Sequence, residues 1–319
     1  MKYRLIYIIL IFTIPLHAFA QQDLVPLSSL YMFNGLTINP AYAGSHEVLS
    51  GMISYRQQWA GFDGAPDDKT FAVHSPVSLN GKKDNFTALG LLGSFQNSTG
   101  LKNGEIYVDY AFHIKLPQGK LSLGLQAGVN YISQNYNITD VRSWMIYGIQ
   151  NPAFTGVERI TIPNFGAGVY YYTDRFYIGA SVPRFFSFPT DTSFSDKRGP
   201  VFDYNRLNFL ATAGWVITFS ENFRFKPSCM VRYQPALGLL TDINASLIMF
   251  RDIVWIGASY RTDKTFIAIL ELQVNSKIKI GYAYDYALGA IKGFSNGSHE
   301  LLFRYELNYK IKAVNPKFF

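Results

Sequence analysis

A strict alternation of apolar and polar side chains constrains the fold of this chain more than any other feature. In the last such run, apolar Leu301, Phe303, Tyr305, Leu307, Tyr309 and Ile311 alternate with polar Arg304, Glu306, Asn308 and Lys310. Successive side chains of a β-strand point to opposite faces, so this period of two predicts a strand with one apolar and one polar face. Similar runs at 106–116, 121–131 and 223–233 are about 11 residues long, enough for a tilted strand to cross a bilayer.

The alternation predicts fourteen strands along the chain. We place them at 49–59, 70–77, 86–96, 104–116, 120–134, 164–172, 175–182, 207–219, 223–233, 242–250, 253–261, 265–274, 277–286 and 298–311. An outer-membrane barrel has short periplasmic turns that alternate with longer outer loops.

The predicted connections follow that alternation of lengths. Short connections such as 117–119 and 251–252 alternate with long ones, namely 135–163, 183–206, 234–241 and 287–297. Two connections depart from it, since 78–85 is long for a turn and 262–264 is short for an outer loop. The pattern predicts an all-β protein, a transmembrane antiparallel β-barrel of about fourteen strands in the outer membrane, with both termini periplasmic.

Composition agrees with a barrel that faces lipid. Charged residues make up 16% of the chain and aromatic residues another 16%, whereas soluble domains carry about 25% charged residues. Mean hydropathy is only +0.04, and after residue 20 there is no apolar run of the roughly 18 residues that a membrane-spanning helix needs.

The first twenty residues have the three regions of a signal peptide. Lys2 and Arg4 precede an apolar stretch, Leu5–Leu16, and Ala18–Ala20 ends in a small-x-small cleavage pattern. A membrane anchor is the alternative, but the apolar stretch is too short to span well. Removing these residues changes the net charge from +7 to 27 − 22 = +5. The dispersed charge and the export signal argue against a nucleic-acid partner.

Residues 21–48 do not alternate and predict a separate segment before the barrel. Pro26, Gly35, Pro40 and Gly44 interrupt it, and it carries apolar side chains that favour burial over exposure to water. The predicted organisation is therefore a signal peptide at 1–20, a short periplasmic plug or docking segment at 21–48, and the barrel at 49–319. A mobile leader is the alternative for 21–48.

Several stretches resemble one known family. Tyr31–Gly44 is similar to the opening signature of the PorP/SprF family of outer-membrane proteins, although Gly35 stands where that family has a bulkier residue or Pro. The resemblance continues through Tyr55–Pro66 and His74–Pro76. It returns near the end of the chain, at Gly281–Tyr286 and at Gly297–Glu300.

This resemblance implies a component of the type IX secretion system and its gliding machinery. The implied partners are other type IX subunits in the periplasm or outer membrane, the lipid bilayer, and a large secreted adhesin whose secretion or surface retention the barrel supports. The alternative function, from another class, is a transport barrel for small hydrophobic or polar solutes. A lumen blocked by 21–48 favours the secretion role, and an open pore favours transport.

The resemblance also suggests which residues form the plug or docking site. In the segment these are Tyr31, Phe33, Asn34, Asn39 and Tyr42, and on the wall they are Arg56 and Trp59. Asn39-Pro40 is a turn signal, because Pro keeps its predecessor extended. Arg56 is expected to pair inside the lumen with Asp63, Asp67 or Glu300, a structural role that we prefer to ligand binding.

The residues predict no catalytic, metal or cofactor site. Ser75 adjoins His74, but neighbours on a strand point to opposite faces and cannot form a nucleophile–base pair. The single Cys229 and the dispersed histidines do not have the spacing of metal ligands. We therefore expect a protein that is not an enzyme.

Overall fold

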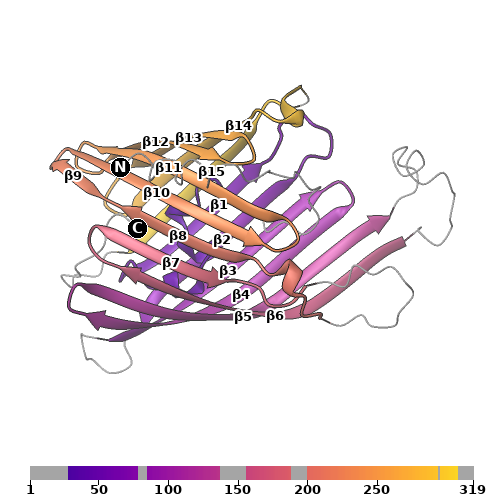
Figure 1. Cartoon of the computed structure of the whole chain (residues 1–319), viewed down its shortest axis with the longest axis horizontal. Helices are drawn as coiled ribbons and strands as arrows, with labels where there is room; N and C mark the ends of the chain where they lie inside the picture. The colour runs from indigo at the N-terminus through magenta and orange to yellow at the C-terminus, as the bar shows by residue number, and fades with distance from the viewer. Residues whose placement is uncertain (1–27, 78–84, 137–155, 188–199, 294, 308–319) are drawn as a thin grey trace, which may run out of the picture.

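The computed structural model describes residues 28–77, 85–136, 156–187, 200–293 and 295–307. One antiparallel sheet follows the chain order from strand to strand and closes on itself, because β10 pairs with β11 as well as with β8 and β9 (Figure 1). The sheet has fifteen strands, but β8 and β9 both pair with β10 and occupy one position in the wall. The result is a closed barrel of fourteen positions, as the alternation predicts.

The strand bounds lie within a few residues of the predicted ones at most positions. The strands are β1 (Leu49–Gln57), β2 (Asp67–Val77), β3 (Phe86–Ser98), β4 (Leu101–Leu116), β5 (Gly119–Tyr136), β6 (Gly156–Tyr172), β7 (Phe176–Val182), β8 (Phe209–Trp215), β9 (Ile217–Ser220), β10 (Phe223–Gln234), β11 (Gly238–Met249), β12 (Val254–Arg261), β13 (Thr265–Gln273), β14 (Ile278–Ala287) and β15 (Ser298–Leu307). Two short 3-10 helices, η5 (Tyr204–Arg206) and η6 (Ala290–Gly293), lie in the connections.

One long connection predicted from the sequence, 234–241, is a short turn. Between β10 and β11 the pairing continues to Gln234 and Gly238, so the expected loop at 234–241 is a three-residue turn at 235–237. The pairing of β3 with β4 likewise continues to Ser98 and Leu101. The connections 58–66 and 288–297 do remain long, and they lie at one end of the barrel, here called the loop mouth. The opposite end, with the turns 117–118 and 221–222, is the turn mouth.

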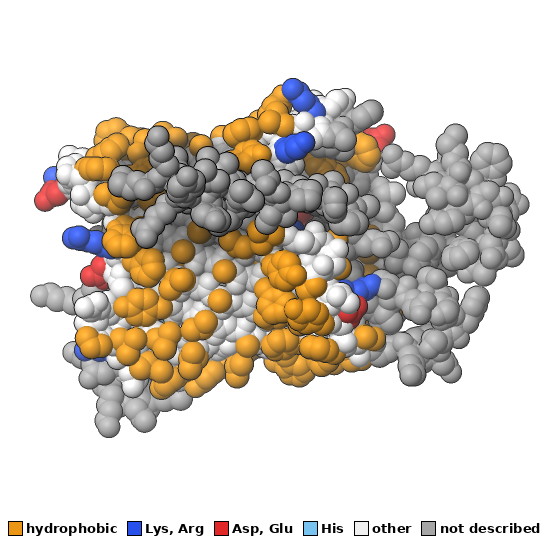
Figure 2. Space-filling view, viewed as in Figure 1, with side chains coloured by type: hydrophobic (Ala, Val, Ile, Leu, Met, Phe, Trp, Pro, Cys, Tyr) orange, Lys and Arg blue, Asp and Glu red, His pale blue; other side chains and the backbone are white. Residues whose placement is uncertain are grey.

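The two faces of the wall differ as the alternation predicts. On β4, Val108 and Tyr110 are 56% and 46% exposed, whereas Asp109 and His113 are completely buried. Figure 2 shows apolar side chains across the outside of the barrel, with charged side chains gathered at its two ends. This distribution suits a wall with an apolar band toward lipid and a polar lumen. Among the described residues, no helix has the length and apolar character needed to cross a bilayer.

Inside the barrel lies the stretch Ser28–Val48, here called the luminal segment. It forms three single-turn 3-10 helices, η1 (Tyr31–Phe33), η2 (Gly35–Thr37) and η3 (Pro40–Tyr42). Asn39 caps η3 by accepting a hydrogen bond from the Ala41 N–H at 2.9 Å, and Pro40 takes the first helical position, where its missing N–H costs nothing. Leu30, Leu36 and Ala41 are completely buried, so the segment is part of the core.

Candidate functional site

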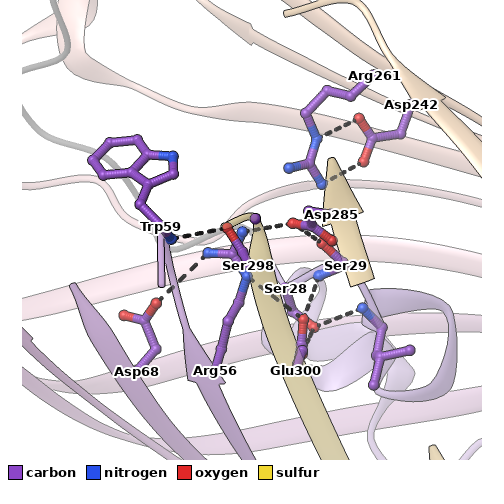
Figure 3. A network of polar contacts seen from close by, with 12 residues as sticks. Ser28, Ser29, Arg56, Trp59, Asp68, Asp242, Arg261, Asp285, Ser298 and Glu300 are labelled. Atoms are coloured by element: carbon purple, nitrogen blue, oxygen red, sulfur yellow. Dashed lines mark hydrogen bonds and ion pairs between the residues drawn. The ribbon is translucent and has the colours of Figure 1, made fainter. Parts of the chain in front are cut away.

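A buried ionic network lies in the lumen near the loop mouth, around Arg56 of β1 (Figure 3). The Arg56 guanidinium donates to Asp285 of β14 at 2.8 Å and lies 3.8 Å from both Asp68 of β2 and Glu300 of β15. All four side chains are at most 6% exposed. Three carboxylates around one guanidinium leave acceptor capacity for other donors.

The luminal segment supplies those other donors. The Ser28 hydroxyl donates to Glu300 at 2.5 Å, and the Ser29 backbone N–H donates to the other Glu300 oxygen at 2.6 Å. The Ser29 hydroxyl donates to Asp285 at 2.8 Å. The same carboxylates that face Arg56 therefore hold the start of the segment through charge-assisted hydrogen bonds, which are stronger than neutral ones.

The partners of Arg56 and the position of Trp59 differ from what the sequence suggests. Glu300 is near Arg56 as predicted, but Asp285 and Asp68 take the places of Asp63 and Asp67. Trp59 donates its backbone N–H to the Ser298 hydroxyl at 3.1 Å, while its half-buried indole ring points away from Arg56 (Figure 3). The bond from Trp59 to Ser298 therefore fixes the loop after β1. It does not join Trp59 to the luminal segment.

Phe33 and Tyr31 anchor the first helical turn of the segment against β11, β12 and β15. The Phe33 ring packs edge-to-face on Trp255 with centroids 5.5 Å apart. Arg304 donates to the Phe33 carbonyl at 3.0 Å and also pairs with Glu271 at 3.2 Å. The Tyr31 hydroxyl accepts a hydrogen bond from Asn244 at 2.5 Å. Phe33 is thus held through its ring and its main-chain carbonyl, and Tyr31 through its hydroxyl.

The two asparagines lie where the chain turns, Asn34 bonding through its main chain and Asn39 through its side chain. Asn34 is buried, and its carbonyl accepts a hydrogen bond from the Thr37 hydroxyl at 2.7 Å. Asn39 caps η3 and also reaches the wall, where its amide donates to the Val169 carbonyl of β6 at 2.9 Å. Asn39 therefore fixes both the local turn and its position against β6.

Glycines of β5–β7 let the segment approach the wall closely. A Cβ at Gly124 would lie 2.1 Å from the Ala41 nitrogen, and one at Gly168 would lie 2.0 Å from the Asn39 side-chain oxygen. Real Cβ atoms essentially never come this close to another heavy atom. Glycine is thus required at Gly124 because the backbone of the segment passes there, and at Gly168 because the Asn39 side chain lies there.

An aromatic and imidazole cluster holds the end of the segment near the turn mouth. The Tyr42 hydroxyl lies 2.8 Å from His46 Nε2, and His46 Nδ1 lies 3.1 Å from Glu306 of β15. The Gly44 N–H donates to His74 Nδ1 at 3.1 Å. The Tyr42 ring also packs edge-to-face on His74, with centroids 5.6 Å apart.

Wall side chains bind the segment largely through its main chain. The main-chain groups held in this way are Ser29 N by Glu300, Phe33 O by Arg304, Ile38 O by Ser181, Ala43 O by His113 and Gly44 N by His74. These side chains come from β15, β7, β4 and β2, so the segment is gripped from opposite sides of the barrel.

The stretches that carry the family resemblance meet at this site. Arg56, His74, Asp285 and Glu300 come from four such stretches that are far apart in the sequence, and they face the segment or its network. No partner was predicted for His74, Asp285 or Arg304. The signals for their role were the family resemblance, which includes His74 and Asp285, and the place of Arg304 on the polar face of a predicted strand.

Two small cavities lie beside the segment. One, lined by Arg56, Asp68, Glu105 and neighbouring hydroxyls, has about 30 Å³. The other, between Tyr31, Tyr42 and Tyr170, has about 20 Å³. Each has room for only one or two waters. Within the described residues, no group of three or more His, Cys, Asp or Glu side chains is placed to hold a metal ion.

Comparison with known proteins identifies one family and one fold. The family described as "Type IX secretion system membrane protein PorP/SprF" matches residues 18–305. No curated protein sequence matches the chain.

Solved structures with a similar fold share little sequence with the chain. The toluene transporter TbuX of Ralstonia pickettii has a TM-score of 0.50 at 8% identity, over 88% of this chain and 94% of that one. The CymD monoaromatic hydrocarbon channel has 0.48 at 12% identity, over 89% and 94%. At such identities the likeness concerns the barrel fold alone.

Proposed function

Because the chain belongs to the PorP/SprF family of type IX secretion system membrane proteins, we propose that it is an outer-membrane component of that system. In this role the barrel contacts periplasmic machinery at the turn mouth and supports secretion or surface retention of a partner protein. The long connections at the loop mouth then face outward, as is usual in outer-membrane barrels.

The occupied lumen is the observation that carries this proposal. The luminal segment is bound by side chains on opposite sides of the wall, and the two cavities described beside it are small, of about 30 and 20 Å³. A channel for solutes would need the segment to leave, which would expose its core side chains and break its buried hydrogen bonds. A barrel occupied in this way suits a membrane anchor for secretion machinery better than a passive pore.

The turn mouth offers an edge to which a periplasmic subunit can bind. Among the described strands, β9 pairs only with β10, so one side of its backbone is not part of the ladder. All four residues of β9 are exposed, and Phe219 is 65% exposed. Unpaired backbone groups are not tolerated in hydrocarbon, so this edge projects into water or pairs with a strand of another protein.

A strained turn lies beside this edge. Phe250, Arg251 and Asp252 all have positive φ, of 55°, 57° and 74°, and each such residue costs of order 1 kcal/mol. Phe250 is 61% exposed, and its N–H donates to the Asn222 carbonyl in the β9–β10 turn at 3.0 Å. Exposed aromatic side chains held out by a strained backbone support a binding role for this part of the turn mouth.

The proposal is tested by loosening the luminal segment. Truncating a buried aromatic side chain to Ala costs about 3–5 kcal/mol, so the double change Phe33→Ala and Tyr42→Ala should release the segment from its wall. We expect an inserted barrel that no longer delivers the secreted partner to the cell surface. The measurements are the amount of partner at the surface and the single-channel conductance of the purified barrel.

A matched control truncates two aromatic side chains on the lipid side, Tyr110→Ala and Phe112→Ala, which leave the lumen unchanged. This control should keep secretion at the level of the unmodified protein. Normal secretion by the Phe33 and Tyr42 variant, together with a large, substrate-selective conductance of the unmodified protein, would instead establish the transport function.

A further inference from the structure

A row of luminal side chains that carry oxygen atoms crosses strands β1–β4. Ser54 of β1 pairs with Thr70 of β2, and Thr70 pairs with Ser94 of β3. Ser94 in turn pairs with Glu105 of β4. Asp68 lies two residues before Thr70, so its side chain points to the same face of the wall. All five side chains line the cavity of about 30 Å³ beside the luminal segment, and each offers only oxygen to a ligand.

Two carboxylates of this cavity have oxygens that accept no hydrogen bond. They are both oxygens of Asp68 and Oε2 of Glu105, in side chains that belong to residues only 5% and 6% exposed. Arg56 lies 3.8 Å from Asp68, and Arg184 bonds to the other oxygen of Glu105. Burial of an ionised carboxylate without a partner is strongly unfavourable. The cavity therefore calls for a ligand that complements negative charge.

The charges around the cavity do not balance. Four buried carboxylates face two guanidinium groups, namely Asp68, Glu105, Asp285 and Glu300 against Arg56 and Arg184. Four negative and two positive charges leave a local net charge of −2 when all six groups are ionised. The neighbouring pair of Arg261 and Asp242 adds no net charge (Figure 3). One divalent cation would neutralise this part of the lumen.

We propose that this cavity binds one hard cation, and that calcium is the ion it fits. Oxygen ligands select hard cations, and Ca²⁺ accepts irregular shells of oxygen, whereas Mg²⁺ demands a near-ideal octahedron. Only Asp68 and Glu105 bring unbonded carboxylate oxygens to the cavity, fewer than a group of three acidic or imidazole side chains. Hydroxyls and water complete the coordination. A cavity of about 30 Å³ has room for an ion and a water, and none for an organic cation.

The bound ion joins the wall to the luminal segment. Ser28 and Thr37 of the segment line the same cavity as Asp68 and Glu105. Glu300, which accepts the hydrogen bond from Ser28, lines it too. A cation at this position therefore lies between the segment and strands β1–β4, and its binding favours the state in which the segment occupies the lumen.

Calcium titration of the purified barrel tests the site. The protein is washed with EGTA, and its thermal unfolding midpoint is then measured against CaCl₂ at constant ionic strength. A ligand that binds only the folded state stabilises it in proportion to ln(1 + [L]/Kd), so the midpoint should rise with the logarithm of the calcium concentration above the Kd. MgCl₂ should give a smaller rise. Equilibrium dialysis with radioactive calcium should find about one ion per barrel.

Three variants locate the ion. Asp68→Asn keeps the shape of the side chain but removes its charge, and it should abolish the rise with calcium. Thr70→Val replaces a hydroxyl with a methyl group, which leaves the ion pairs intact, and it should raise the Kd for calcium about tenfold. Asp63→Asn is the matched control, because Asp63 is an exposed residue of the connection 58–66, outside the cavity. It should keep the full rise.

Two results would overturn the proposal. If calcium did not raise the midpoint of the unmodified barrel, water or a proton would satisfy Asp68 instead. If calcium raised the midpoints of Asp68→Asn and the unmodified barrel equally, the ion would be bound elsewhere. Neither measurement involves secretion, so the calcium site and the proposed function can fail independently.

Discussion

The two sides of the lumen hold the same segment by different means. On β1, β2 and β12–β15 the wall is ionic, with Arg56 and Arg304 each surrounded by carboxylates. On β5–β7, Ser181 and Lys120 also hold the segment, but Gly124, Gly168 and Gly179 bring the backbone of the wall against it. We call these the ionic wall and the glycine wall.

The difference shows that one lumen combines two kinds of specificity. The ionic wall orients the segment through hydrogen bonds whose donors and acceptors must match in charge and position. The glycine wall accepts it by shape, since close packing leaves no space for one added methyl group. Removing an ion-pair or hydrogen-bond partner should lower the free energy of unfolding most on the ionic wall. Adding an atom should lower it most on the glycine wall.

The largest effect is expected from Arg304→Leu on the ionic wall. This change leaves Glu271 and Glu306 without the guanidinium and the Phe33 carbonyl without its donor. Removing one partner of a buried ion pair costs about 3–5 kcal/mol. The free energy of unfolding, from urea titrations of the folded barrel, should fall by that amount. Arg304→Lys keeps the charge but loses the fork geometry, and it should recover only part of the loss.

A smaller effect is expected from Gly124→Ala on the glycine wall. The new Cβ would lie 2.1 Å from the Ala41 nitrogen, and backbone cannot move aside as a flexible side chain does. Overpacking of this kind costs about 1–3 kcal/mol. The readout is the unfolding midpoint together with protease access to η3. Gly51→Ala is the matched control, because its Cβ would make an ordinary contact of 3.6 Å with Val73. Equal effects of Gly124→Ala and Gly51→Ala on the unfolding midpoint would show that close approach of the segment does not require glycine at position 124.

The smallest effect is expected from Asp68→Asn, at the margin of the ionic wall. Its nearest approach to Arg56 is 3.8 Å, whereas Asp285 accepts a hydrogen bond from Arg56 at 2.8 Å. We expect Asp68→Asn to lower the free energy of unfolding by less than the about 3–5 kcal/mol that losing a closely bonded partner of a buried ion pair costs. Asp285→Asn should cost more, because it also weakens the bond from Ser29. If Asp68→Asn lowered the free energy of unfolding more than Asp285→Asn, the distance of a carboxylate from Arg56 would not determine how much its contact contributes.

The barrel was predictable because its signal is local. Alternation on β4 and β15 needs only the sequence of one strand, and it predicts a polar face on each. Asp109, His113 and Arg304 lie on these faces and are buried in the lumen. The start of β6 at Gly156 was missed because Pro163, which cannot donate to a ladder, favours a break there. Pro163 nevertheless pairs with Val129 in the structure.

The contacts of the site were not predictable because they depend on closure. Arg56 meets Asp285 only when β1 pairs with β15 and β15 with β14, a relation that no local pattern encodes. The glycines of β5–β7 are typical of barrel strands, and nothing in the sequence distinguishes those that face Asn39 or Ala41. Phe33 and Tyr42 were singled out by the family resemblance, and their neighbours Trp255 and His46 were not.

The position of the luminal segment has a consequence for the order in which the protein assembles. The bond between Ser28 and Glu300 joins residues 272 positions apart, so it forms only after nearly the whole chain has been made. Contacts of the segment with β4–β7 need far less of the chain and can form first. Since a closed wall would exclude the segment, the strands must wrap around it as a template, and pairing of β15 with β1 completes the enclosure.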